Sequence, residues 1–269
     1  MKRSTLILAA LVALLPITPA RAQAQDEATE SALTERNRVL DISAEVLKPK
    51  EMEFALFWGH LGIGVLPRVQ LSAELAPFLI TLANISAKGQ LVDLPQLKVS
   101  LEAGIWYLVA SKVVNADLFF SVPVALRATV PLAAGFELHL AGKFSWLALR
   151  GMPDAFSGRD TPRDTDTRTF AAQVTLARYD SSGAFYLQGT LPVLTNAHAA
   201  VPNFLGRIDV VSSDMILGNT DAWSVLLGRD QAFGSNFHVR LGIGYRNKPG
   251  LFTESIDRVM VDLNGYWRF

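Results

Sequence analysis

Ionised side chains recur at alternate positions within several apolar segments of this chain. In the segment 97–107, Lys98 and Glu102 alternate with leucine, valine and isoleucine. Near the C-terminus, Asp262 stands between a valine and a leucine. A charged side chain is costly to place in lipid or in an apolar core, so these groups belong in a wet or mutually paired interior. The chemistry they offer is electrostatic binding or selection of ions.

The charged positions that we expect to line this interior form a mildly cationic set. One interpretation is the lining of a passage that favours small anionic solutes. The other is a network of salt bridges that stabilises a narrow, effectively closed interior. The sequence leaves both open. The positions are Arg68, Glu74, Lys88, Lys98, Glu102, Arg127, Glu137, Lys143, Arg240, Arg246, Arg258, Asp262 and Arg268.

No other group of residues has the spacing of a catalytic or metal site. The carboxylate-rich segment 158–167 lacks the glycine and terminal glutamate of an EF-hand loop, so we interpret it as a solvated loop. The glycine pairs at 61–65 and 241–245 are interpreted as space for large neighbours such as Trp58 or Tyr266. We therefore expect no enzyme activity, no metal and no cofactor. The histidines, which show no serine or metal-ligand pattern, are His60, His139, His198 and His238.

Alternation of apolar and polar residues continues along most of the chain and predicts β-strands. We predict about twelve, an even number that is typical of closed single-chain bacterial barrels. Pro123 and Pro192 interrupt two strands and a further apolar run lies at 208–211, so ten and fourteen strands remain alternatives. The predicted strands are 38–47, 53–65, 68–77, 83–92, 97–110, 117–131, 136–149, 168–179, 184–195, 221–229, 237–246 and 256–269.

The predicted connections alternate between short and long. Short turns on one side and longer loops on the other are typical of barrels that span an outer membrane, with the short turns in the periplasm. This alternation favours a transmembrane barrel over a soluble one, and it places the N- and C-termini in the periplasm. The role of the long loops, 150–167 and 196–220, is left open. The short connections are 66–67, 93–96, 132–135, 180–183 and 230–236.

The chain ends in Val-Asp-Leu-Asn-Gly-Tyr-Trp-Arg-Phe, and the alternation continues to Phe269. This stretch resembles the C-terminal targeting strand of Gram-negative outer-membrane β-barrels, in which a terminal Phe follows alternating apolar residues. The resemblance covers about the last nine residues, and Gly265 stands one position from the common glycine. It implies an antiparallel transmembrane barrel in the outer membrane and an assembly signal, read by the barrel-assembly machinery, that includes Trp267 and Phe269.

The N-terminus has the pattern of a secretory signal peptide. Lys2 and Arg3 precede the apolar run 6–17, and Ala20-Arg21-Ala22 is a small-x-small cleavage site. The expected organisation is a signal peptide at 1–22, a polar leader or short plug at 23–37 and the barrel at 38–269. The formal net charge is zero, which gives no reason to expect nucleic acid as a partner. The absence of cysteine excludes thiol catalysis and disulfides.

The sequence thus predicts an all-β, antiparallel outer-membrane barrel with lipid as its surroundings. The predicted function is a passive channel for small solutes, with a preference for anions if the cationic lining is open to them. A structural or surface-interaction barrel with a filled lumen is the first alternative, and an outer-membrane hydrolase is the second. Conductance separates the first two, because only an open lumen carries ions.

Overall fold

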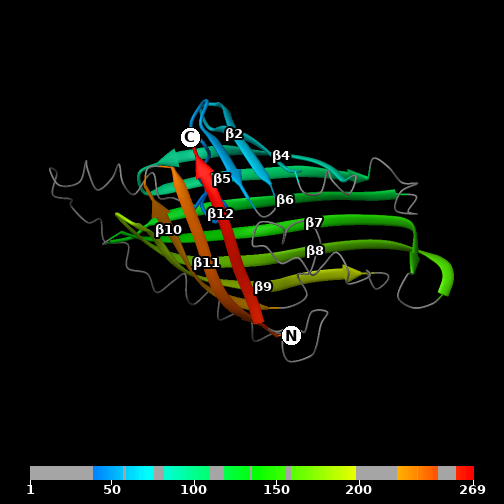
Figure 1. Cartoon of the computed structure of the whole chain (residues 1–269). Coiled ribbons are helices and arrows are strands. Elements are labelled where there is room, and N and C mark those ends of the chain that lie inside the picture. The colour runs from blue at the N-terminus through cyan, green and yellow to red at the C-terminus, as the bar shows by residue number, and fades with distance from the viewer. Residues whose placement is uncertain are drawn as a thin grey trace.

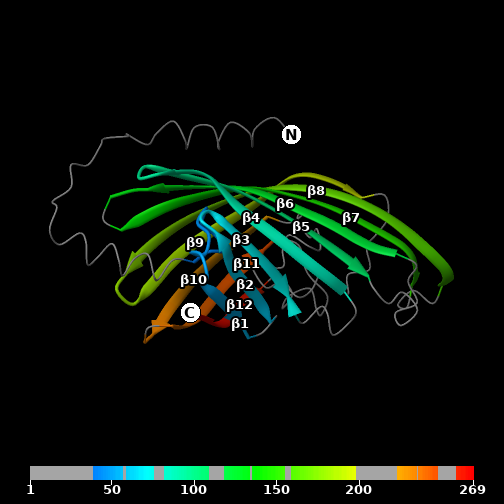
Figure 2. The same cartoon turned by 90° about the horizontal axis from the view of Figure 1, so that it is seen from above.

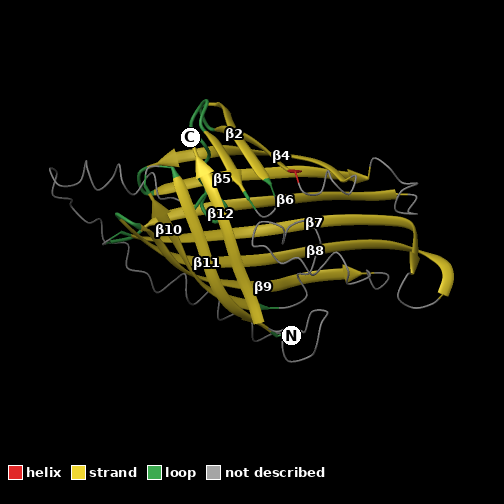
Figure 3. Ribbon diagram, viewed as in Figure 1, coloured by secondary structure: helices red, strands yellow, loops and turns green. Residues whose placement is uncertain are grey.

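The computed structural model describes residues 39–56, 59–75, 82–108, 118–133, 135–154, 159–197, 223–234, 236–247 and 259–269. Nearly all of these residues belong to strands, as Figure 3 shows in yellow. Within the described residues, no helix has the length and apolar character needed to cross a membrane. The fold is therefore all-β, as the alternation in the sequence predicts.

Twelve strands follow one another along the chain (Figure 1). They are β1 (Met52–Ala55), β2 (His60–Leu66), β3 (Val69–Glu74), β4 (Leu82–Leu94), β5 (Leu97–Leu108), β6 (Leu118–Pro131), β7 (Phe136–Asp154), β8 (Arg159–Asp180), β9 (Gly183–Ala197), β10 (Ser224–Phe233), β11 (Phe237–Arg246) and β12 (Val259–Arg268).

Each strand pairs with its neighbours in sequence, and β1 pairs with β12 to close the barrel. All the pairs are antiparallel. The closing pair is short, with Glu53, Phe54 and Ala55 opposite Arg268, Trp267 and Tyr266. Figure 2 shows β4–β9 on one side of the barrel and β10–β12 with β1–β3 on the other. Closure leaves no sheet edge among these strands.

The two faces of β12 show which side of the wall is the interior. Val261 is 65% exposed, whereas the adjacent Met260 and Asp262 are 7% and 1% exposed. The same alternation continues to Phe269, which is 65% exposed. The apolar face of the last strand therefore points outward and its polar face inward, as the sequence predicts.

The predicted strand at 38–47 is wrong. Residues 39–51 form bends and turns without a strand, and Ile42 and Ser43 both donate their backbone N–H groups to the carbonyl oxygen of Val39. The predicted strand at 53–65 is in fact two strands, β1 and β2. Gly59, between them, has a φ of 62°, which is a left-handed conformation that glycine adopts without strain. The two errors cancel, and the total of twelve strands is confirmed.

The predicted loop at 150–167 is also largely wrong. Strand β7 continues to Asp154 and β8 begins at Arg159, so that only 155–158 separates them. Threonine is β-branched and favours strands, and Thr161, Thr165 and Thr167 recur along this part of β8. The hairpin curves away beyond the ends of the neighbouring strands in Figure 1.

The two prolines within predicted strands do lie in strands. Pro192 lies where the register between β8 and β9 shifts, because Phe170 pairs with Leu194 while Ala171 pairs with Pro192. Pro123 lies where the β5–β6 ladder lacks two pairs. Each proline therefore occupies an irregular part of a ladder, where the missing N–H donor is tolerated.

The barrel has two unlike ends. At one end, which we call the turn end, the connections 67–68, 95–96, 132–135, 181–182 and 234–236 are two to four residues long, and the C-terminus lies beside β1. At the other, which we call the loop end, connections reach the length of 198–223. The predicted contrast between short and long connections is therefore present. The loop at 196–220 lies mostly outside the described residues.

Candidate functional site

The outer wall of the barrel is apolar along most strands. Leucine, isoleucine and valine side chains such as Leu227, Leu241 and Ile243 are more than half exposed. Exposed apolar area on this scale is unusual for a soluble monomer. Aromatic rings lie close together near both ends, with Phe237 against Trp267 at the turn end and Phe120 against Trp146 toward the loop end. The chain has the architecture of the outer-membrane β-barrel class, and the charged interior is its candidate site.

A segment of the chain itself occupies this interior. Residues 39–48, which we call the plug, precede β1, and most of them are buried. Ile42, Ala44 and Leu47 are 3%, 0% and 0% exposed. Burial of residues that belong to no strand shows that the barrel wall surrounds the plug. The interior is therefore filled, at least in part, by the protein's own N-terminal region.

One wall holds the plug by apolar contact. Val39 and Ile42 form a buried cluster with side chains from β8, β9 and β10. The wall residues of this cluster are Ala177, Tyr179, Ala184, Tyr186 and Leu226. Burying two aliphatic side chains contributes about 1.5–3 kcal/mol for each.

The opposite wall holds the plug by hydrogen bonds to its backbone. Lys88 of β4 donates its ammonium to the carbonyl oxygens of Leu40 and Ser43, at 2.7 and 2.9 Å. Thr129 Oγ1 of β6 accepts the N–H of Ala44 at 2.8 Å. These contacts satisfy backbone groups of the plug that pair with no strand.

Two further contacts come from β3 and from the glycines of β2. Gln70 Oε1 of β3 accepts the N–H of Leu47 at 3.1 Å. A Cβ atom at Gly64 of β2 would lie 1.9 Å from the carbonyl oxygen of Lys48. The glycine at position 64 therefore makes room for the backbone of the plug. The interpretation that it makes room for a large side chain is wrong for this position.

Two ion pairs join the plug to the wall. Asp41 accepts a hydrogen bond from Arg240 of β11 at 2.8 Å. Glu45 pairs with Lys98 of β5. In both pairs a wall cation meets a plug carboxylate, so the plug lowers the positive charge that the predicted lining would otherwise present.

Other predicted lining residues pair within the wall. Arg127 binds one carboxylate oxygen of Glu102 through Nε and a terminal nitrogen, at 3.1 and 3.0 Å. The carboxylate of Glu74 pairs with a histidine of β2, and its Oε1 lies 2.7 Å from His60 Nδ1. These contacts tie neighbouring strands together on the inner face of the wall.

The remaining predicted residues lie in different surroundings. Glu137, Arg246 and Arg268 are buried, and Arg268 pairs with Glu53 of β1 at 2.6 Å. Asp262 accepts the hydroxyl of Tyr186 at 2.7 Å, and Lys143 is buried beside a polar cavity. Arg68 is exposed in the turn between β2 and β3, with a φ of 75°, and it lines the cavity at the turn end rather than the middle of the lumen. Arg258 lies outside the described residues. Trp267 and Phe269 lie on the outer face of β12 and at its end.

A buried cluster near the turn end joins β10, β11 and β12. Asp230 is 0% exposed and accepts a hydrogen bond from the hydroxyl of Tyr266 at 2.9 Å. His238 Nδ1 lies 3.0 Å from the same carboxylate, and its ring stacks on that of Tyr266 at 4.8 Å. Arg240 Nε lies 3.5 Å from it. This cluster braces the wall beside the plug.

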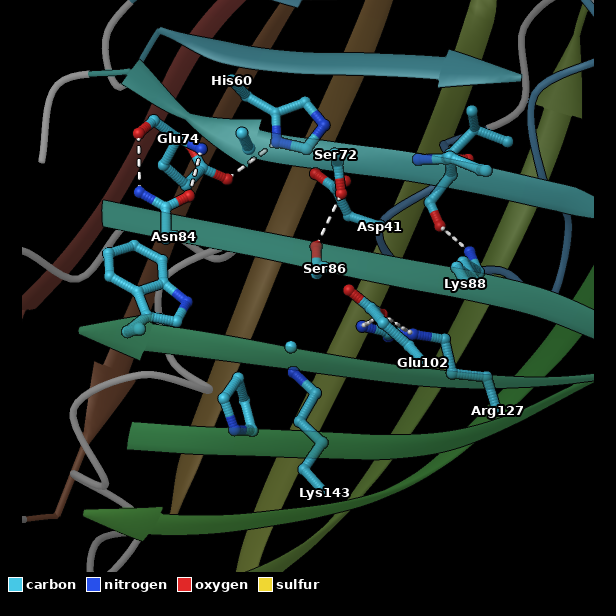
Figure 4. A pocket seen from close by; sticks show the side chains of 16 residues that line it. Asp41, His60, Ser72, Glu74, Asn84, Ser86, Lys88, Glu102, Arg127 and Lys143 are labelled. Carbon is cyan, nitrogen blue, oxygen red and sulfur yellow. Dashed lines mark hydrogen bonds and ion pairs between the residues drawn. The ribbon is translucent and has the colours of Figure 1, made fainter. Parts of the chain in front are cut away.

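Figure 4 shows the polar cavity that remains between the plug and β2–β7. Its volume is about 60 Å³, and His60, Glu74, Lys88, Glu102 and Arg127 are among its lining residues. A water molecule needs about 10–15 Å³ of such volume, so the cavity has room for about four to six waters. A larger cavity of about 480 Å³ lies at the turn end.

The described lumen offers hydrogen-bonding and charged groups. Within the described residues, no group of three or more His, Asp or Glu side chains could hold a metal ion. The serines of the cavity, Ser72 and Ser86, hydrogen-bond to each other at 2.7 Å. What this arrangement does chemically is to hold a peptide segment through hydrogen bonds and ion pairs.

Sequence reasoning includes Lys88, Lys98 and Arg240 in the predicted lining but misses the other residues by which the plug is held. It places Asp41 and Glu45 in a strand and assigns no role to Gln70, Thr129 and Tyr186. A signal exists in β2, where glycines recur at alternate positions beside the region 39–48, but the sequence alone does not show what fills the space that they leave.

No family model matches this chain, and no curated protein matches it. Among solved structures, it is similar to the beta domain of the Bordetella autotransporter Brka, with 9% sequence identity and a TM-score of 0.37. The similarity covers 82% of this chain and 83% of that chain. A likeness this distant carries no functional inference, and the geometry of the lumen remains the basis for assigning a function.

Proposed function

We propose that this protein is a Gram-negative outer-membrane β-barrel whose lumen is closed by its own N-terminal plug, and that it acts as a structural or surface-interaction barrel. The observation that carries the proposal is the plug, which contacts strands on opposite sides of the lumen. A passive channel needs a continuous aqueous path, and the plug occupies the interior where that path would run.

The outer surface supports a location in a membrane. Its side chains are apolar between two zones of aromatic rings, which is the arrangement expected where a barrel meets the hydrocarbon and the two interfaces. The signal peptide at 1–22 and the C-terminal strand pattern support export and assembly into the outer membrane. In this orientation the turn end faces the periplasm.

The β7–β8 hairpin supports a surface role. Its strands are 19 and 22 residues long, whereas β10, β11 and β12 have 10 residues each. A hairpin that extends beyond the wall at the loop end would stand outside the cell and offer a surface to a partner.

A gated channel is the second candidate, and one observation favours it. Much of what holds the plug is polar: two ion pairs and hydrogen bonds from Lys88, Thr129 and Gln70. Ion pairs weaken as salt screens them, so a gated channel would open more often at high ionic strength. In this candidate the charges of the wall would line the passage after the plug leaves.

Conductance in a planar lipid bilayer tests the proposal. We expect full-length protein to be non-conducting and a variant that lacks 39–48 to form stable pores. A deletion of equal length at 27–36, upstream of the plug, is the matched control and should not conduct. Full-length protein that conducts as well as the plug deletion would contradict the proposal. Openings of the full-length protein that increase with salt would favour the gated channel.

A further inference from the structure

Two arginines lie on the outer face of the barrel, where apolar residues prevail. On β8, Arg178 stands between Ala177 and Tyr179, which both belong to the buried cluster behind the wall. On β10, Arg229 precedes Asp230, which is 0% exposed and points inward. Because side chains alternate along a strand, both arginines point outward. A cation on the lipid-facing side is the feature that needs an explanation.

These arginines form a cross-strand row with two phenylalanines. Phe136 of β7 is opposite Arg178, Arg178 is opposite Phe185 of β9, and Phe185 is opposite Arg229. The guanidinium of Arg178 lies 5.6 Å from the centroid of the Phe136 ring, and that of Arg229 lies 4.1 Å from the centroid of Phe185. We call these four residues the Phe-Arg row. The rings hold both cations against the wall.

The row lies near the turn end. Arg178 is two positions before Asp180, which pairs with Gly183 across the β8–β9 turn. At about 3.3 Å per residue, the row lies roughly 7 Å along the strand from that turn. An outward arginine costs about 2–4 kcal/mol at the midplane of a bilayer but about 0–1 kcal/mol near an interface. The row therefore lies at the depth of the lipid headgroups.

The two arginines differ in their ionic partners. Arg229 donates to the two carboxylate oxygens of Asp180, at 3.0 and 3.4 Å, and also to Ser182 and Gln231. The hydrogen bond from Arg229 holds the pKa of Asp180, at the turn beyond the lipid-facing wall, well below its ordinary value. Among the described residues, no carboxylate pairs with Arg178, which is exposed beside the Phe136 ring. Arg178 thus offers a fixed guanidinium fork to an external anion.

We propose that the Phe-Arg row is a binding site for the phosphate group of a membrane lipid, with Arg178 as the phosphate ligand and Arg229 as a braced neighbour. Guanidinium groups bind phosphate oxygens in a bidentate manner, and the flanking phenylalanines contact the acyl chains or glycerol. This inference rests on the proposed location in a membrane. It adds a defined lipid site on β7–β10 to a barrel that otherwise contacts lipid non-specifically.

The test is lipid retention by folded protein. Full-length protein is refolded in vesicles of phosphatidylcholine that contain a minor share of phosphatidylglycerol, extracted in mild detergent, and its bound lipids are counted by native mass spectrometry. We expect retained phosphatidylglycerol to fall roughly fivefold in Arg178→Gln, since one arginine near an anionic surface contributes about that factor. Arg68→Gln, an exposed arginine at the same end of the barrel, is the matched control and should retain lipid as the parent does.

A second variant tests whether the rings position the cation. Phe136→Leu keeps the charge and much of the apolar area, and we expect a loss of roughly twofold, smaller than that of Arg178→Gln. Equal retention by the parent and by Arg178→Gln, in protein that shows heat-modifiable folding, would overturn the inference and leave the proposed function intact. Protein that inserts into no vesicle would overturn both. Displacement of the lipid by millimolar inorganic phosphate would show a general anion site instead and would also overturn it.

Discussion

The two walls that hold the plug differ in what they recognise. The wall of β8–β10 offers apolar side chains to Val39 and Ile42, whereas the wall of β3–β6 bonds to backbone atoms and to one carboxylate. Apolar side chains can pack in several orientations, whereas a hydrogen bond to a backbone group forms only when the plug has a defined position relative to the wall. The comparison indicates that the apolar wall supplies much of the adhesion and that the polar wall fixes the register of the plug.

The largest effect is expected where the plug meets backbone rather than side chains. In Gly64→Val, the new Cβ would lie 1.9 Å from the carbonyl oxygen of Lys48, and no flexible group can move aside. We expect the plug to be expelled while the barrel still folds, because β2 has intact partners in β1 and β3. Conductance should rise to that of the variant lacking 39–48. A non-conducting Gly64→Val barrel with normal gel mobility would contradict this prediction.

A large effect is also expected from the apolar wall. Ile42 is 3% exposed, and Ile42→Ala should weaken the seating of the plug by about 2–4 kcal/mol through lost burial and a cavity. Limited proteolysis within 39–48 measures how often the plug leaves the lumen. Met52→Ala, which truncates an exposed side chain on β1, serves as the control. Equal cleavage rates in the parent and in Ile42→Ala would show that the apolar wall contributes little.

A somewhat smaller effect is expected from the polar wall. Lys88→Met keeps most of the length of the side chain but leaves the carbonyl oxygens of Leu40 and Ser43 without their donor, at a cost of about 1–3 kcal/mol. If this wall sets the register, single channels of Lys88→Met should flicker between several sub-conductance levels. Channels of Ile42→Ala should open fully or not at all. The same gating pattern in both variants would remove the distinction between the walls.

The smallest effect is expected at the rim of the β8–β10 wall, where Asp180 pairs with Arg229 and neither residue contacts the plug. In the folded protein, the pKa of Asp180 lies below its ordinary value of 3.8, chiefly because Arg229 donates a hydrogen bond to its carboxylate. Its stabilising contribution is therefore fully present above about pH 4 and is lost as the pH falls from there toward the lower folded pKa. Because the pair is partly exposed, the effect is small. The difference in urea midpoint between the parent and Asp180→Asn should shrink below about pH 4. A constant difference from about pH 7 to about pH 2.5 would contradict this.

Many of the wall strands could be predicted because the alternation of apolar and polar residues within each strand depends only on that strand's own sequence. In β12, side chains point alternately to the outer face and to the interior. The alternation of residue types from Val259 to Phe269 therefore predicts which face each side chain occupies. Tight turns also leave a local signal, because each short connection interrupts the alternation between two strands. Orientation of the ends relative to the cell stays a prediction, as do the signal peptide at 1–22 and the leader at 23–37.

The plug could not be distinguished from a strand for a specific reason. Leu40 to Val46 alternate strictly between apolar and polar residues, as a strand does. In the structure, however, neighbours on both faces are buried: Ile42 and Ser43 are 3% and 0% exposed. The apolar set packs on one wall and Asp41 and Glu45 reach the cations of others, so alternation reflects two protein surfaces rather than protein and lipid. Local pattern does not separate these cases.

The seam between β1 and β12 lies directly beside the plug. Three residues, 49–51, connect the plug to β1, and Met52 exchanges backbone hydrogen bonds with Phe269 at 3.1 and 2.9 Å. A tether this short keeps the plug beside the mouth of the lumen even when its contacts with the wall are broken. Sealing the cylinder and filling it are therefore coupled, because the strand that completes the seam also carries the segment that occupies the interior.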